Sequence, residues 1–250
     1  MSASVGWLVF LCAFGGAVLG LLLQSVLPEH HLSADSKGVI GLGVGLIGTM
    51  AALLLGLLIA SAQGTYEAQR SELTQLSAKV VLLDRLLAHY GPEAAPIRAE
   101  LRLNTQRVIA QMWPSRDPPS AAASLGSAGG DLVYEGIQEL SPHTDQQRWI
   151  QSQALSMVMD LGNLRALMTS QRSAQIPSVF LILVVFWLTV VFVSFGLFAP
   201  RNATVIATLF FCALAVATAI FLILELNSPY AGLIRLRPAP LQAALAQLGQ

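Results

Sequence analysis

Four segments of the chain are apolar and contain no charged residue. They are Val5–Leu27, Gly38–Ala62, Ser178–Pro200 and Asn202–Leu224. An α-helix rises about 1.5 Å per residue, so each segment is long enough to cross a hydrocarbon core of roughly 30 Å. Their few polar residues are mostly hydroxyls, which can bond to carbonyls of their own helix. The pattern predicts an all-α membrane protein with four transmembrane helices.

The polar stretch between the second and third of these segments has the periodicity of helices. Apolar residues recur every three or four positions over Leu73–Leu87, and Gly91-Pro92 is a typical helix stop. A second helix is predicted over Ile97–Met112 and a third over about Asp145–Gln175. Residues 114–130 are rich in Pro, Ser, Ala and Gly, and are predicted to form a loop. We expect the first and third helices to continue the second and third spans into a cytoplasmic helical bundle.

These patterns divide the chain into four regions. The first pair of transmembrane helices is expected in residues 1–62 and the cytoplasmic helical domain in 63–177. The second pair is expected in 178–226, followed by a cytoplasmic C-terminal tail over 227–250. Only 11% of the residues are charged and the net charge is zero, whereas a soluble domain is about 25% charged. The composition therefore indicates a lipid bilayer as the partner and gives no reason to expect nucleic acid.

Basic residues close to the membrane predict the orientation. Five of them flank spans on the side that holds both termini and residues 63–177, and two lie on the opposite side. The five are Arg70, Arg165, Arg172, Arg235 and Arg237, and the two are Lys37 and Arg201. The bias predicts a multi-pass protein of the bacterial plasma (inner) membrane with the termini and residues 63–177 in the cytoplasm.

No residue pattern indicates an enzyme, a cofactor or a metal site. Gly43–Gly48 matches the dinucleotide fingerprint, but that motif needs a preceding strand and a following acidic residue. Close helix packing is therefore the favoured interpretation. His30 and His31 lack a third ligand at a defined spacing, so a solvated loop is favoured over a metal site. Cys12 and Cys212 both lie in predicted spans and are expected to pack as small apolar residues.

Small residues recur four or eight positions apart in the first two spans, a pattern typical of close helix contacts in membranes. The helix-packing candidates are Gly16 and Gly20 in the first span, and Gly41, Gly45, Gly48 and Gly56 in the second. They predict a tight helix–helix interface, within one subunit or between subunits.

Glu225 is the one titratable residue at the edge of a span. Its carboxylate could cap a neighbouring helix, pair with an arginine near the membrane, or join Asn227 in binding a hard cation. A structural role is favoured, with ion handling as the second interpretation.

Four motifs carry a family resemblance: Gly56–Ala62, Leu82–Glu93, Phe195–Asn202 and Glu225–Gly232. Together they resemble the bestrophin-like family of bacterial membrane proteins, over nearly the whole chain. The family is named for its distant similarity to bestrophins, which are pentameric anion channels with four spans and long cytoplasmic helices. The residues that carry the resemblance are Asp84, Arg85, Tyr90, Gly91, Pro92, Pro200, Asn202, Glu225, Asn227, Pro229, Tyr230 and Gly232. The acidic cluster that binds calcium in animal bestrophins has no counterpart here.

The resemblance implies an ion channel, selective for anions, that conducts along the axis of a homo-oligomer, with the second span lining the pore. The oligomer would be a pentamer if the resemblance extends that far. The candidate constriction consists of four residues beside the glycines, Leu42, Leu46, Leu53 and Leu57. Packing in the bundle core is the competing interpretation for each of them. The alternative function is a non-conducting scaffold or signalling protein whose cytoplasmic helices bind a partner. A transporter is less favoured because Thr49 is the main polar group near the midplane.

Overall fold

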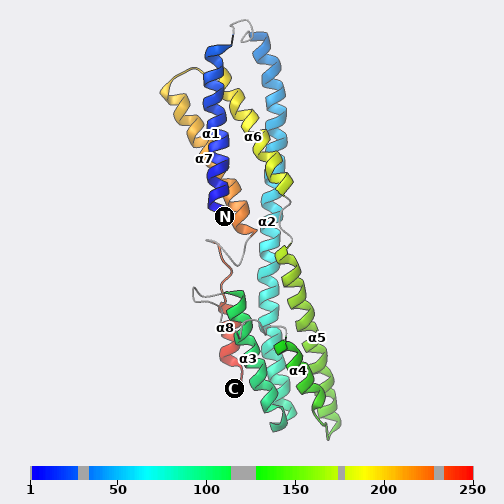
Figure 1. Cartoon of the computed structure of the whole chain (residues 1–250). Helices are drawn as coiled ribbons and strands as arrows, with labels where there is room; N and C mark the ends of the chain where they lie inside the picture. The colour runs from blue at the N-terminus through cyan, green and yellow to red at the C-terminus, as the bar shows by residue number, and fades with distance from the viewer. Residues whose placement is uncertain (1, 28–33, 114–127, 174–177, 228–233, 250) are drawn as a thin grey trace. The chain divides into compact units, whose positions relative to one another are not determined.

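The computed structural model describes residues 2–27, 34–113, 128–173, 178–227 and 234–249. These residues are almost entirely helical and include no strand (Figure 1). The helices are α1 (Ser2–Val26), α2 (Ala34–Tyr90), η2 (Pro92–Ala94), α3 (Ala95–Met112), α4 (Ala128–Glu139), α5 (Asp145–Ser173), α6 (Ser178–Phe198), α7 (Ala203–Leu226) and α8 (Ala239–Gln247). Among them, α1, α2, α6 and α7 are long and apolar enough to cross a membrane, which confirms the prediction of four spans.

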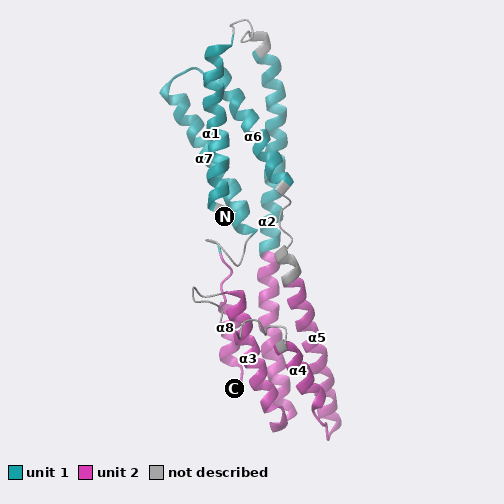
Figure 2. Cartoon of the chain, in the orientation of Figure 1, with its two compact units in different colours: residues 1–66, 175–234 teal, residues 67–174, 235–250 magenta. Residues whose placement is uncertain are grey.

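The chain forms two compact units (Figure 2). Unit 1 consists of Met1–Tyr66 and Gln175–Ile234, and unit 2 of Glu67–Ala174 and Arg235–Gln250. The long helix α2 contributes its first part to unit 1 and its second part to unit 2. At about 1.5 Å per residue its 57 residues are far longer than a bilayer is thick, so its charged second part extends beyond the span.

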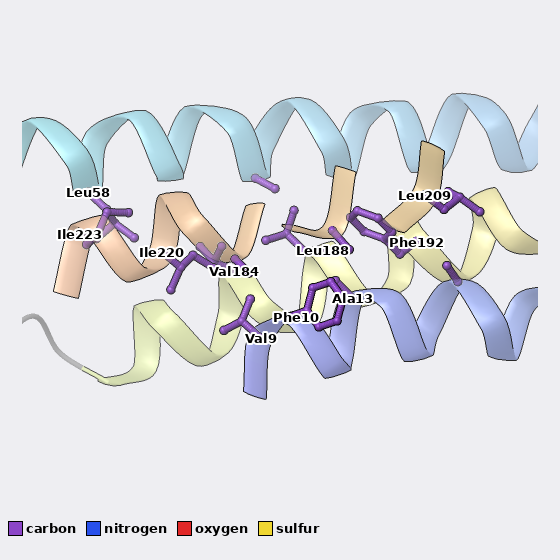
Figure 3. Packing of buried hydrophobic residues seen from close by; sticks show 14 of the residues in the cluster. Val9, Phe10, Ala13, Leu58, Val184, Leu188, Phe192, Leu209, Ile220 and Ile223 are labelled. Carbon is purple, nitrogen blue, oxygen red and sulfur yellow. The ribbon is translucent and has the colours of Figure 1, made fainter. Parts of the chain in front are cut away.

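The core of unit 1 is built from all four apolar helices, with α1 packed against α6 and α7. Figure 3 shows side chains of α1, α6 and α7 meeting in this core, with Leu58 of α2 beside Ile223 of α7. Ala13 and Ala17 of α1 are almost completely buried. Small side chains at these positions let the helix backbones approach closely, which is how helices gain packing energy where lipid removes the hydrophobic drive.

Unit 2 is a helical bundle in which α3 packs on α4, α4 on α5, and α8 on α3. The helix α2 ends at Tyr90, as predicted, because Gly91 adopts a φ of 134° that other residues rarely tolerate. Pro92 then opens η2 and returns the chain as α3.

Parts of this bundle differ from the sequence-based expectations. Residues 128–130 of the predicted loop are helical because they begin α4, whereas 114–127 lie outside the described residues. The predicted tail contains the helix α8. The expected continuation of α5 into α6 falls on residues 174–177, which also lie outside the described residues.

Candidate functional site

The four leucines proposed for a constriction lie on one face of α2. Leu42, Leu46, Leu53 and Leu57 are 64–78% exposed, so none of them packs in the core of its own chain. Successive residues of an α-helix are about 100° apart, and the spacings of 4, 7 and 4 keep all four within a sector of about 60°. We call this sector the leucine face. The competing interpretation, packing in the core of the single chain, does not agree with this exposure.

A different face of α2 packs against its own chain. Val44, Ala51, Leu58 and Ala62 are buried, with relative exposures below 10%. At about 100° per residue these positions lie on the side of the helix opposite the leucine face. Unit 1 therefore leaves the leucines pointing away from the other three apolar helices.

The glycines of α2 define a third face, roughly a quarter turn from each of the other two. A Cβ atom placed on Gly41, Gly45, Gly48 or Gly56 would meet nothing within 4 Å. Three of them, Gly41, Gly45 and Gly48, line a hollow of about 560 Å³ together with residues of α6 that include Ser194 and Phe195. These glycines therefore make no close helix contact with the residues that the structure describes. The predicted helix–helix interface at the second span would then have to lie between subunits.

The glycines of α1 behave differently. A Cβ atom on Gly16 would lie 3.2 Å from Thr189 of α6, and one on Gly20 would overlap the carbonyl oxygen of Val193. Gly196 makes the reciprocal approach to Ala17. The α1–α6 contact thus depends on small residues from both helices.

In unit 2, the motif residue Asp84 forms a buried ion pair with Arg98 of α3. Arg98 donates two hydrogen bonds, from Nε to Oδ1 and from Nη2 to Oδ2, each 2.8 Å long. The backbone N–H of Gly249 donates a third, 3.1 Å long, to Oδ2. The Asp84 side chain is 4% exposed, so this carboxylate joins α2, α3 and the segment after α8. Arg85, its neighbour in the motif, is exposed.

The surroundings of Asp84 shift the pKa of the pair. Burial raises the pKa of Asp84, but the hydrogen bonds from Arg98 and Gly249 and the charge of Arg98 outweigh it, so the pKa lies below the ordinary value of 3.8. The hydrogen bond to Asp84 raises the pKa of Arg98, against the opposing effect of burial. Both groups are therefore charged at neutral pH, and the arrangement is structural.

Arg98 and Gly249 were not predicted as partners of Asp84. A signal for Arg98 existed, because Asp84 and Arg98 are each seven residues from Gly91. In a helical hairpin, residues equally distant from the turn come to lie side by side. No local signal links Gly249 to Asp84, because the contact joins segments far apart in the sequence.

The remaining residues of this motif shape the end of α2. Tyr90 is buried, and its carbonyl accepts a hydrogen bond of 3.0 Å from Nε2 of Gln147 on α5. Gly91 and Pro92 form the turn. These residues hold the hairpin of α2 and α3 against α5.

The motif residues of unit 1 lie at the ends of α7. Asn202 caps its N-terminus, because its side-chain oxygen accepts a bond of 2.8 Å from the backbone N–H of Val205. Pro200 precedes this cap. At the other end, Glu225 is buried and Asn227 is the C-cap. Pro229, Tyr230 and Gly232 lie outside the described residues.

A cation site at Glu225 receives no support from the part of the chain that the structure describes. Within those residues, no group of three or more His, Cys, Asp or Glu could hold a metal ion. Glu225 is buried at the end of α7, and its structural role stays a prediction.

Four apolar spans, one of which extends into a separate helical bundle, define an all-α integral membrane protein. The chain belongs to the bestrophin-like family, because the profile of the bestrophin-like domain matches residues 11–241. This finding confirms the resemblance that the motifs indicated. No curated protein matches the sequence.

Solved structures with the same fold include crystal structures of a bacterial bestrophin homologue from Klebsiella pneumoniae. A tryptophan-to-alanine variant is 14% identical with a TM-score of 0.72, and the match covers 99% of this chain and 97% of the homologue. A leucine-to-threonine variant is 16% identical with a TM-score of 0.65, covering 94% and 98%. The form phased on zinc is 14% identical with a TM-score of 0.66, covering 93% and 96%. At these identities the likeness establishes the fold.

Proposed function

We propose that this protein is an ion channel that conducts along the axis of a homo-oligomer, with α2 around the axis. The observation that carries the proposal is the division of α2 into a buried face, a leucine face and a glycine face. A helix in a ring needs one side against its own subunit, one side toward the axis and one against its neighbour. The opposite placement of the buried and leucine faces meets the first two needs. The glycine face meets the third, because small residues permit close approach.

The leucine face would then form an apolar constriction. Such a constriction gates by excluding water, and the ion crosses when the passage becomes wet. The spans carry no basic residue, so anions would be stabilised by helix N-termini and hydroxyls. Thr49 offers little here, because its hydroxyl already donates a bond of 2.8 Å to the carbonyl of Leu46. Anion selectivity and a pentameric state are supported by the family resemblance.

The same proposal includes the orientation. The bias of arginines toward the side of unit 2 supports a cytoplasmic location for that unit and for both termini, in a bacterial inner membrane. On this assignment the connection between α1 and α2 faces outward, as does the short turn at Arg201 between α6 and α7.

Bilayer recordings of the purified, reconstituted protein test the proposal through a matched pair of variants. Leu46→Ser removes one leucine of the proposed constriction, and Leu11→Ser changes a leucine of α1 with almost the same exposure, 63% against 64%. Leu46→Ser should raise the leak conductance about tenfold, because a hydroxyl lowers the barrier to wetting. Leu11→Ser should leave the conductance unchanged, because in the proposed ring it faces lipid.

Two results would contradict the channel. One is a monomeric protein in several mild detergents with no current from the wild type or from Leu46→Ser. The other is an equal rise in conductance for both variants, which would indicate general leakiness. The first result would favour the non-conducting scaffold.

A further inference from the structure

Unit 2 contains a cavity of about 530 Å³ among its helices, which we call the bundle cavity. Leu76, Val80 and Leu83 of α2 form one wall, and Leu101 and Val108 of α3 form another. The helices α4, α5 and α8 complete the lining. Cavities of roughly 300–1,000 Å³ with mainly apolar walls and a few polar groups are typical of small-molecule sites.

One polar group in this lining lacks a hydrogen-bond partner. Asn104 is 7% exposed, and its Oδ1 accepts no bond from the described residues. A Cβ atom on Gly129 would lie 2.5 Å from this oxygen, so the glycine lets the start of α4 come close to it. A buried acceptor without a donor has lost its hydrogen bonds to water without compensation. A ligand that donates an N–H or O–H to Oδ1 would supply that compensation.

The two charged residues in the lining, Asp131 and Arg165, have opposite charges. Burial lowers the pKa of Arg165 of α5, and the charge of Asp131 on α4 counteracts this effect. Arg165 and Asp131 both line the bundle cavity. The nearby Arg107 is bonded to Glu100 at 2.8 Å. Because cations and carboxylates offset each other, the cavity offers a guanidinium donor and a carboxylate acceptor without a net charge. A charged head group would be attracted by one of Asp131 and Arg165 and repelled by the other, so the lining favours a net charge of neither sign.

We propose that the bundle cavity binds a small amphipathic molecule with an apolar body and an uncharged head group that both donates and accepts hydrogen bonds. A primary carboxamide is the simplest such head. Its N–H groups suit Asn104 Oδ1 and the carboxylate of Asp131, and its carbonyl suits Arg165. This site lies within unit 2 and does not depend on conduction by unit 1.

Fluorine NMR on the full-length protein in lipid nanodiscs tests the proposal. The probe is 3-(4-fluorophenyl)propanamide, and the matched competitor is 3-(4-fluorophenyl)propanoate, which has the same body and a charged head. Empty nanodiscs provide the control for partitioning into lipid. We expect protein-dependent line broadening for the amide and at least about tenfold weaker binding of the carboxylate, the size of one unmatched buried hydrogen bond. Equal binding of the two, tighter binding of the carboxylate, or no binding of the amide would overturn the proposal.

Two variants show whether the probe occupies the bundle cavity. Gly162 lines the cavity, and a Cβ there would meet nothing within 4 Å, so Gly162→Met should place its side chain in the cavity without strain. Asn163→Met places the same methionine side chain at the next position of α5, which is exposed and does not line the cavity. Binding should fall at least tenfold in Gly162→Met and remain unchanged in Asn163→Met. If Gly162→Met does not fold, Ala166→Met, also in the lining, serves instead. Unchanged binding in the filled variant would contradict the site.

The assignment of the head group depends on Asn104. Asn104→Leu keeps the approximate shape of the side chain and removes the unmatched acceptor, so the protein should fold at least as stably. The preference for the amide over the carboxylate should drop by about tenfold in this variant. An unchanged preference would overturn the role of Asn104.

Discussion

The two parts of α2 belong to one continuous helix but bury different patterns. In unit 2, Gln69, Leu73, Leu76, Val80, Leu83, Leu87 and Tyr90 are buried at alternating steps of four and three residues. This is the seam of a helix packed in a bundle, and Ser77 and Asp84 beside it are buried too, so the buried stripe is broader than the two positions in seven of a strict coiled coil. In unit 1 the buried positions are fewer, and the leucine face and the glycine face are left uncovered by the chain.

Exposure of an apolar side chain therefore has a different meaning in the two units. Seven large apolar residues are exposed on the part of α2 that belongs to unit 1: Val39, Ile40, Leu42, Leu46, Met50, Leu53 and Leu57. In water, such a surface would indicate a missing partner. In a bilayer, lipid tails cover apolar side chains at no cost, so burial no longer identifies the core. The direction of each face must then be argued from residue size and spacing, as for the leucines and glycines of α2.

The largest loss of stability is expected from a substitution in the buried seam of α2 in unit 2. Leu87 is 0% exposed, so Leu87→Ala should lower the free energy of unfolding by about 2–5 kcal/mol through the cavity that it leaves. Leu53→Ala makes the same change on the leucine face, where the side chain is 75% exposed, and should change it by less than about 0.5 kcal/mol. Thermal unfolding followed by circular dichroism compares the two. Similar midpoints for both variants would show that the two parts of α2 do not differ in this way.

The next effect concerns the ion pair that fixes the end of this seam. Asp84→Asn should destabilise unit 2 by about 3 kcal/mol, because it leaves the guanidinium of Arg98 without its counter-charge. Arg85→Gln, at the exposed neighbour, serves as the control. Thermal unfolding of the purified protein measures both.

The pH dependence supplies an independent check on this pair. The folded-state pKa of Asp84 is lowered, so its contribution is complete above the unfolded value of about 3.8 and is lost as the pH falls through the folded value. The acid branch of the stability curve should therefore be flatter for Asp84→Asn than for the wild type. Parallel acid branches would contradict the lowered pKa.

A substitution on the glycine face should have the smallest effect on the folding of a subunit. Its effect on assembly of the oligomer should be larger. A Cβ atom on Gly45 would meet nothing within 4 Å, and the hollow beside it leaves room for a longer side chain, so each subunit of Gly45→Leu should fold normally. If the face contacts a neighbouring subunit, overpacking should weaken assembly by about 1–3 kcal/mol. Gly15→Leu makes the same substitution at an exposed glycine of α1, where a Cβ atom would also meet nothing within 4 Å, and should assemble normally. Light scattering after size-exclusion chromatography gives the oligomer masses, and normal assembly of Gly45→Leu would place the interface elsewhere.

The sequence allowed the spans and the end of α2 to be predicted because each depends on local residues. Uncharged runs define the spans, and Gly91-Pro92 defines the stop. The helix α4 was not predicted. One reason is that Gly129 and Gly130 at its start have low helix propensity. The helix α8 is short, and short helices form through tertiary packing rather than propensity.

In the candidate site, too, the features that depend on tertiary packing could not be predicted from local residues. The leucines and glycines of α2 could be grouped by spacing, but spacing alone did not show that the chain leaves both faces uncovered. The bundle cavity was not predicted, because it joins five helices whose packing no local pattern specifies. In the sequence, nothing distinguishes Asn104 from other polar residues of a helix. Only the structure shows that Gly129 lies close to its side-chain oxygen.

The equal distances of Asp84 and Arg98 from Gly91 also bear on how this family can vary in length. A single residue inserted between Gly91 and Arg98 would turn the guanidinium by about 100° around α3 and carry it away from the carboxylate. The same insertion would shift every later contact of α3 with α4 and α8. Gains and losses of residues in evolution should therefore be rare between positions 84 and 98.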